Sequence, residues 1–199
     1  MKRGSRFSLN DAMPVFFTDD EYAVVEAACA LLIPTDDDAG ATEARVVDYI
    51  DGLLGAFTFD PPRIWAGGPF SGRNGGASGF KRFHHLTPLD ELAWRTRIEG
   101  SLGQPEREFN GPVIGLQEHY RAGLVSLGAD FATVTDEERR VRLERSSTFT
   151  KLLYEHACEG MYGAPEYGGN QGLVGWGYIG YEGDVQPRGY TDEEVSGRD

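Results

Sequence analysis

His156 and Glu159 have the residue types and the spacing that acid–base chemistry requires. Histidine titrates near neutral pH, and a carboxylate three residues further along a helix lies on the same face, so the two side chains could share a proton. The same pair also suits a structural role at the end of a helix, which is the commoner use of such residues. The residues alone leave both hypotheses open.

Metal chemistry is not indicated by the remaining candidate ligands. A zinc site needs three or four converging ligands, and the histidines lack an H-E-x-x-H or similar spacing. The acidic turn at Asp36–Asp38 lacks the calcium-loop pattern and is interpreted as a solvated turn. The four histidines are His84, His85, His119 and His156.

Thiol and nucleotide chemistry are also not indicated. Cys29 and Cys158 are the only cysteines and form no C-x-x-C pair, so we expect two buried thiols, with one disulfide between them as the alternative in an exported protein. Residues 175–180 read GWGYIG and match G-x-G-x-x-G. That fingerprint needs a strand before it and a helix after it, and here more glycine-rich sequence surrounds it.

Apolar periodicity predicts about five helices and no strand, which is a mainly α fold. The clearest start is the capping box Thr18–Glu21, with Phe17 and Tyr22 placed as a hydrophobic staple, and Pro34 stops this helix. Thr87 followed by Pro88 begins a later helix in the same way. The other expected helices cover residues 46–57, 113–127 (ending at Gly128) and 136–160, the last opened by a second capping box at Thr135–Glu138.

Two segments lack helical or strand periodicity and are rich in glycine and aromatic residues. The first is the long loop 59–85, which contains Trp65 and Phe70, and the second is the C-terminal segment 161–199. Glycine permits unusual backbone angles and close approach, whereas tryptophan and tyrosine supply large amphipathic contact areas. We therefore expect both segments to form irregular surfaces that are suited to binding another molecule.

The composition indicates one domain over residues 1–199, with an N-terminal arm at 1–16 and a helical core at 17–160 that contains the inserted loop. The formal net charge of −13 argues against nucleic acid as a partner. Residues 1–6 resemble the basic start of a signal peptide, but no apolar run follows. We expect a soluble chain without a membrane span or signal peptide, cytoplasmic unless a signal-bearing partner exports both chains to the periplasm.

Several ordered motifs resemble the gluconate 2-dehydrogenase subunit 3 family. Residues 156–170 read HACEGMYGAPEYGGN, followed by VGW at 174–176 and IGY at 179–181. They are similar to the family's H-x-x-E-G-[FM]-[FY]-x-x-P-x-Y-G-G-N and G-W-x-x-I-G-[FY]. The N-terminal half adds FFTDDE at 16–21, ALLIPT at 30–35 and VVDYID at 46–51.

The resemblance implies a non-catalytic small subunit bound to a large flavoprotein of the glucose-methanol-choline oxidoreductase class, a dehydrogenase of sugars, sugar acids or alcohols. The large subunit would hold FAD, in some complexes with an iron–sulfur cluster, and a cytochrome c subunit would accept electrons in some of them. The small subunit would stabilise, mature or help export its partner and stay bound, with no cofactor of its own.

The alternatives are an independent enzyme that uses His156 and Glu159, and a chaperone that releases its flavoprotein client. The residues we expect at the partner interface or in the family motif, some of them with a purely internal role as the alternative, are His156, Glu159, Gly160, Tyr162, Pro165, Tyr167, Gly168, Gly169, Asn170, Gly175, Trp176, Trp65 and Phe70.

Overall fold

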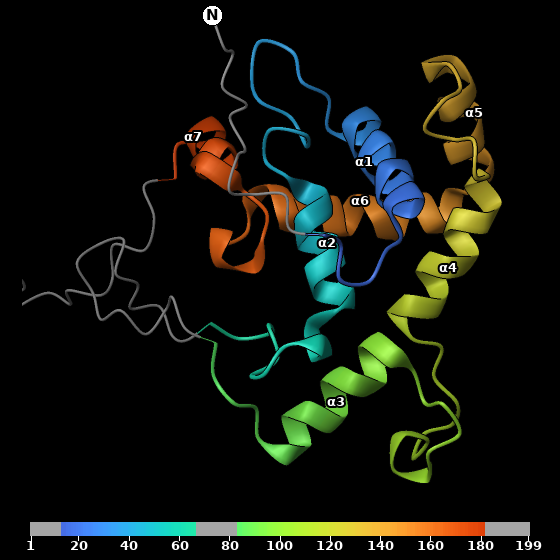
Figure 1. Cartoon of the computed structure of the whole chain (residues 1–199), viewed down its shortest axis with the longest axis vertical. Coiled ribbons are helices and arrows are strands. Elements are labelled where there is room, and N and C mark those ends of the chain that lie inside the picture. The colour runs from blue at the N-terminus through green and yellow to red at the C-terminus, as the bar shows by residue number, and fades with distance from the viewer. Residues whose placement is uncertain (1–12, 67–82, 182–199) are drawn as a thin grey trace, which may run out of the picture.

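The computed structural model describes residues 13–66 and 83–181, and the part of the chain that it describes is helical without strands (Figure 1). Short 3-10 turns, η1 (Ala56–Thr58), η4 (Pro105–Arg107), η5 (Pro165–Tyr167) and η6 (Gln171–Leu173), connect some of the helices. The helices are α1 (Asp19–Leu32), α2 (Val46–Leu54), α3 (Pro88–Glu99), α4 (Leu116–Leu127), α5 (Asp136–Arg145), α6 (Ser147–Tyr162) and α7 (Val174–Ile179). The expected mainly α fold is confirmed.

The longest helix, α6, lies at the centre of the molecule. It contacts α1, α2, α4, α5 and α7, and it crosses the middle of the view behind α1 and α2 (Figure 1). Its buried residues Phe149, Leu153 and Met161 recur at helical spacing and belong to one continuous hydrophobic cluster with the other helices. The C-terminal end of α6, where the motif at residues 156–170 begins, is therefore held in place by packing against the other helices.

The N-terminus of α1 is held in two ways. The predicted capping box is confirmed: the Glu21 backbone N–H donates to Thr18 Oγ1 (3.3 Å), and the Thr18 backbone N–H donates to the Glu21 carboxylate (2.8 Å). The buried carboxylate of Asp51 in α2 accepts the backbone N–H groups of Val15, Phe16 and Phe17 at 2.7–3.0 Å. The chain before α1 is thereby attached to α2.

The described part of the chain has seven α-helices, two more than expected. The helix expected over 136–160 is broken at Ser146 (φ −97°, ψ 38°), because the bend lets Leu143 of α5 and Phe149 of α6 both reach the core. The second added helix, α7, lies in a segment expected to be irregular. The expected helices 46–57 and 113–127 are shorter than predicted, ending at Leu54 and beginning at Leu116.

None of the helices within residues 13–66 and 83–181 is long and apolar enough to cross a lipid bilayer.

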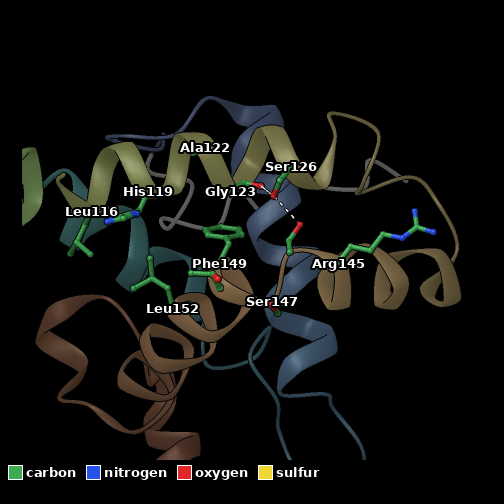
Figure 2. Close-up of a pocket in the computed structure, with 11 residues that line it drawn as sticks. Leu116, His119, Ala122, Gly123, Ser126, Arg145, Ser147, Phe149 and Leu152 are labelled. Atoms are coloured by element: carbon green, nitrogen blue, oxygen red, sulfur yellow. Dashed lines mark hydrogen bonds between the residues drawn. The ribbon is translucent and has the colours of Figure 1, made fainter.

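The contact between α4 and α6 depends on Gly123, which faces the ring of Phe149 (Figure 2). A Cβ atom at residue 123 would lie 2.2–2.4 Å from three ring carbons of Phe149. We expect Gly123→Ala to lower the free energy of unfolding by about 1–3 kcal/mol through overpacking, measured by urea denaturation. Gly52→Ala in α2 is the matched control, because its Cβ would meet only Tyr167 O at 3.7 Å. Equal stability of the two variants would contradict this packing.

Candidate functional site

The segment after α6 folds back on that helix around the side chain of Asn170, which is fully buried. Asn170 Nδ2 donates to the carbonyl of Gly163 at 2.9 Å, and Oδ1 accepts the backbone N–H groups of Gly175 (2.9 Å) and Trp176 (3.4 Å). Its backbone has φ 47° and ψ 39°, a left-handed conformation that asparagine tolerates better than most residues. Asn170 therefore joins the end of α6 to the start of α7.

Two glycines of the motif allow backbone to touch backbone. A Cβ at Gly169 would lie 2.1 Å from the carbonyl oxygen of Gly160, and one at Gly175 would lie 1.9 Å from that of Met161. The indole of Trp176 closes the same fold, because its Nε1–H donates to the carbonyl of Tyr162 at 2.7 Å and the residue is buried. The spacing of the motif thus follows from internal packing.

His156 and Glu159 are each bound to a tyrosine of another helix rather than to one another. His156 is buried, and its Nδ1 lies 2.9 Å from the hydroxyl of Tyr120 in α4. Glu159 accepts a hydrogen bond of 2.7 Å from the hydroxyl of Tyr49 in α2. The pKa of Tyr49 is raised, first by its burial and then by this contact with Glu159. The two side chains therefore connect α6 to α2 and α4, and they do not form the polar pair that their spacing suggested.

Stability should depend on pH through His156, because burial lowers the pKa of its imidazole, with Arg97 adding to this effect and Glu159 and Glu155 opposing it. Unfolding returns the pKa to about 6.5. As the pH falls through this value, the unfolded chain therefore binds a proton before the folded chain does, and the free energy of unfolding falls.

We expect His156→Gln, which removes the titrating ring, to flatten the pH dependence of the urea midpoint around the pKa of the unfolded chain. His119→Gln, on the exposed face of α4, is the control. A slope unchanged by His156→Gln would show that this imidazole does not titrate on unfolding.

A pocket of about 510 Å³ lies between α2, α3, the end of α6 and the residues that follow it. Four aromatic side chains contribute to its walls, and the hydrogen-bonded Tyr49 and Glu159 supply polar groups there. The lining residues are Tyr49, Leu53, Arg63, Ile64, Trp94, Cys158, Glu159, Tyr162, Gly163, Ala164 and Tyr167. We refer to this cavity as the motif pocket, because its lining includes six residues of the sequence motif at 156–170.

Tyr167 joins the motif pocket to both ends of the inserted loop. Its hydroxyl accepts the backbone N–H of Ala66 at 3.1 Å, and its ring packs edge-on against Phe83 with centroids 5.7 Å apart. The rings of Trp65 and His84 lie 4.8 Å apart, and the His84 N–H donates to the Trp65 carbonyl at 2.9 Å. Residues 65–66 and 83–84 are therefore close together beside the pocket, with Trp65 exposed.

The sequence matches the model of one protein family, described as gluconate 2-dehydrogenase subunit 3, over residues 19–183. This range begins at the first residue of α1 and includes α7, so it contains every element of the site. The chain belongs to this family. Comparison with curated proteins and with solved structures gave no match. The family description places this subunit-3 chain among the components of a dehydrogenase complex.

In this subunit-3 chain most of the predicted site residues fall into two groups. Gly160, Gly168, Gly169, Asn170, Gly175 and Trp176 hold the C-terminal fold, whereas Glu159, Tyr162 and Tyr167 line the motif pocket. Pro165 begins the turn η5 that carries Tyr167. Trp65 lies beside the motif pocket, where its ring contacts that of His84. Phe70 lies outside the described residues. The role of these residues at an interface stays a prediction.

Some contributors to the site in this subunit-3 protein were missed from the sequence. Tyr49 and Trp94 line the pocket from α2 and α3, and Tyr120 is the buried partner of His156. The VVDYID motif, which ends at Asp51, carried a signal for Tyr49, because it was one of the family-like segments. Trp94 carried none, because nothing in its neighbourhood along the chain distinguishes it from an ordinary core tryptophan.

The structure also shows where the cysteines of this subunit-3 chain lie. Cys29 and Cys158 are free thiols, Cys29 is buried and Cys158 half-buried, and burial followed by the charge of Glu26 raises the pKa of Cys29 to about 12. Within residues 13–66 and 83–181, no three histidine, cysteine or acidic side chains converge as metal ligands would.

A second hollow of about 580 Å³ lies between α4 and the start of α6 (Figure 2).

Proposed function

We propose that this chain is the non-catalytic small subunit that binds the FAD-containing large subunit of a dehydrogenase of sugars, sugar acids or alcohols, and that helps this partner to fold and mature. The proposal rests on the motif at residues 156–170 of this subunit-3 family chain, whose side chains either pack inside the fold or line a pocket. Of the candidate acid–base pair, His156 is buried and bound to Tyr120, and Glu159 is bound to Tyr49. The aromatic groups of the motif instead line an open pocket.

The contact face of this proposal is the motif pocket with Trp65 beside it. Amphipathic aromatic residues dominate the energetics of protein interfaces, especially around a pocket that accepts an anchor side chain of the partner. The pocket accepts one apolar or aromatic side chain of the flavoprotein, and Tyr49, Glu159 and Arg63 supply polar groups for the rim. The net charge of −13 favours a partner surface with basic residues around that anchor.

Binding of this kind stabilises the large subunit without any chemistry in the small one. A protein that binds only the folded form of its partner stabilises it by RT ln(1 + [L]/Kd), which is about 2.7 kcal/mol at a hundredfold excess over Kd. The helical bundle around α6 suits this task, because its pocket walls come from three helices fixed by one core. A folded large subunit then retains FAD. In this proposal the same contact carries the small subunit through any export that the partner's signal directs.

The test is to express the large flavoprotein subunit with and without this chain. We expect the FAD content and the dye-reducing activity of the large subunit to fall severalfold without it, and the two chains to co-purify. Equal yield, FAD content and activity in both cases would overturn the accessory function. A large subunit that depends on this chain for its yield but does not remain bound at nanomolar concentration would instead favour a transient chaperone.

A pocket-filling variant tests the proposed face directly. We expect Ala164→Trp, which places a large ring in the motif pocket, to weaken capture of the large subunit at least tenfold while the thermal midpoint stays within a few degrees. Ala129→Trp, at an exposed position between α4 and α5, is the matched control and should bind like the parent chain. Equal affinity of the two variants in titrations by interferometry would exclude the motif pocket from the interface.

A further inference from the structure

The connection between α3 and α4, residues 100–115, is a closed loop whose two ends touch. Ser101 donates its backbone N–H to the Val113 carbonyl at 2.9 Å, and the Val113 N–H donates to Ser101 Oγ at 2.5 Å. Gly100 and Gly115 approach so closely that a Cβ at residue 115 would lie 2.3 Å from the Gly100 nitrogen. Compact loops of this length with adjoining ends are Ω-loops, which are frequently functional. We refer to residues 100–115 as the Ω-loop.

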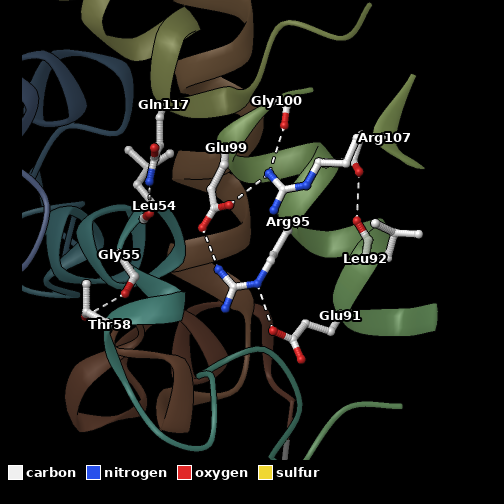
Figure 3. A network of polar contacts seen from close by, with 11 residues as sticks. Leu54, Gly55, Thr58, Glu91, Leu92, Arg95, Glu99, Gly100, Arg107 and Gln117 are labelled. Carbon is white, nitrogen blue, oxygen red and sulfur yellow. Dashed lines mark hydrogen bonds and ion pairs between the residues drawn. The ribbon is translucent and has the colours of Figure 1, made fainter. Parts of the chain in front are cut away.

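Arg107 fixes the interior of the Ω-loop to α3 (Figure 3). Its side chain is buried, and Nη1 donates to the Glu99 carboxylate at 3.0 Å and to the Gly100 carbonyl at 3.1 Å. Glu99 also accepts from Arg95 at 2.8 Å, and the Arg95 guanidinium lies 4.0 Å from the centre of the Phe57 ring. The Ω-loop is therefore tied into the helical core and presents its outer side chains from a fixed frame.

Several of those outer side chains are large and apolar. Leu102 is 69% exposed, Phe109 is 92% exposed and Ile114 is 56% exposed. Leu102 also has φ 53°, in the left-handed region where a leucine is strained by about 1–2 kcal/mol and glycine or asparagine would not be. Backbone strain lowers the stability of the isolated chain, and exposed apolar surface lowers its solubility. A fixed loop that carries both features is therefore expected to contact another molecule.

Charge decides between the possible occupants. Apart from Arg107, which turns inward to Glu99, the charged residues of the Ω-loop are Glu106 and Glu108. An anionic lipid surface is disfavoured next to these carboxylates, and so is a second copy of the same acidic loop. A protein surface with an apolar hollow bordered by basic residues is complementary to both features of the loop.

We infer that the Ω-loop is a second docking element for the large flavoprotein subunit, in which Leu102 and Phe109 enter an apolar hollow bordered by lysine or arginine. This inference rests on the proposed function and adds a contact separate from the motif pocket. Helix α3 connects the two, because Trp94 lines the pocket and the Ω-loop begins at Gly100, one residue beyond the helix. The partner therefore contacts both the middle of α3, at Trp94, and the loop that follows its C-terminal end.

The experiment measures the affinity of the large subunit for the full chain and for the double variant Leu102→Asn/Phe109→Ser. The matched control is Leu89→Asn/Val125→Ser, which removes two apolar side chains that are 74% and 83% exposed on α3 and α4. We expect the Ω-loop variant to raise Kd at least tenfold and the control to change it less than twofold. The thermal midpoint of the Ω-loop variant should stay level or rise, because Leu102→Asn relieves strain.

The outcomes separate the inference from the function on which it rests. Binding by the parent chain with equal affinity of both double variants would overturn the Ω-loop contact and leave the accessory function standing. Failure of the parent chain to bind the large subunit would overturn both. Sedimentation of this chain alone adds one more test, because a dimer that the Ω-loop variant converts to a monomer would identify a second copy as the occupant and overturn the inference.

Discussion

Asn170→Ala should release the C-terminal segment from α6 and lower the free energy of unfolding by about 3–5 kcal/mol. Alanine leaves the Gly163 carbonyl and the Gly175 N–H buried without their partner, and each unpaired group costs about 1–3 kcal/mol. Alanine also tolerates the left-handed backbone at residue 170 less well than asparagine. Because natural domains are stable by only about 5–15 kcal/mol, this one side chain carries a large share of the stability.

Urea denaturation and limited proteolysis check this expectation, with cleavage expected first between residues 163 and 181. Asn170→Asp is the informative companion, because it keeps the acceptor for the Gly175 and Trp176 N–H groups and removes the donor to Gly163. Asn110→Ala, in the exposed part of the Ω-loop, controls for loss of an asparagine. A loss below about 1 kcal/mol for Asn170→Ala would show that the segment does not depend on this hub.

Gly169→Ala should be at least as damaging as the loss of Asn170, for a steric reason. Its Cβ would lie 2.1 Å from the carbonyl oxygen and 2.8 Å from the carbonyl carbon of Gly160, atoms of a helix backbone that cannot turn aside as a side chain can. We expect a loss of about 3 kcal/mol or more, together with weaker binding of the large subunit, because the turn before Asn170 also positions Tyr167 in the motif pocket.

Gly177→Ala is the control for this substitution. It lies in α7 of the same segment, and a Cβ there meets no atom within 4 Å. Its thermal midpoint should equal or slightly exceed that of the parent chain, since alanine favours helix over glycine by about 1 kcal/mol. Equal midpoints for Gly169→Ala and Gly177→Ala would contradict the backbone contact between residues 160 and 169.

Helix starts could be predicted from the sequence because their signals are local. Thr18, Thr87 and Thr135 each accept a backbone N–H three residues ahead, as the capping patterns indicated. The break at Ser146 could not be predicted, because the apolar spacing continues across it and the bend is imposed by packing against other helices. Helix α7 was missed because its glycines hide helical periodicity, and the contact with Asn170 supplies what its composition lacks.

The candidate site also had one part that local sequence signals predicted and one part that they did not. The motif at 156–170 indicated which residues matter, and the structure places most of them around one turn of chain. Their roles depend on partners far away in sequence: Tyr120 for His156, Tyr49 for Glu159 and Trp94 for the pocket. Spacing along one helix predicts that two side chains share a face, but it does not reveal which third group from another helix binds each of them.

Helix α3 contributes to both proposed contact surfaces, the motif pocket and the Ω-loop. From the sequence it was an ordinary helix between two more informative segments. In the structure it places Trp94 in the motif pocket, holds the Arg95–Glu99–Arg107 network and begins the Ω-loop. A partner that contacts both features would depend on the fixed distance along this helix between Trp94 and the Ω-loop.

Hydrogen–deuterium exchange of this chain, alone and bound to the large flavoprotein subunit, tests the central claim most directly. The account predicts slower exchange in the complex at residues 63–66, 92–96 and 159–167 around the motif pocket, and unchanged exchange in α5, which takes no part in the pocket. Unchanged exchange around the motif pocket in a complex with demonstrated binding, with protection elsewhere, would contradict the claim that this face holds the partner.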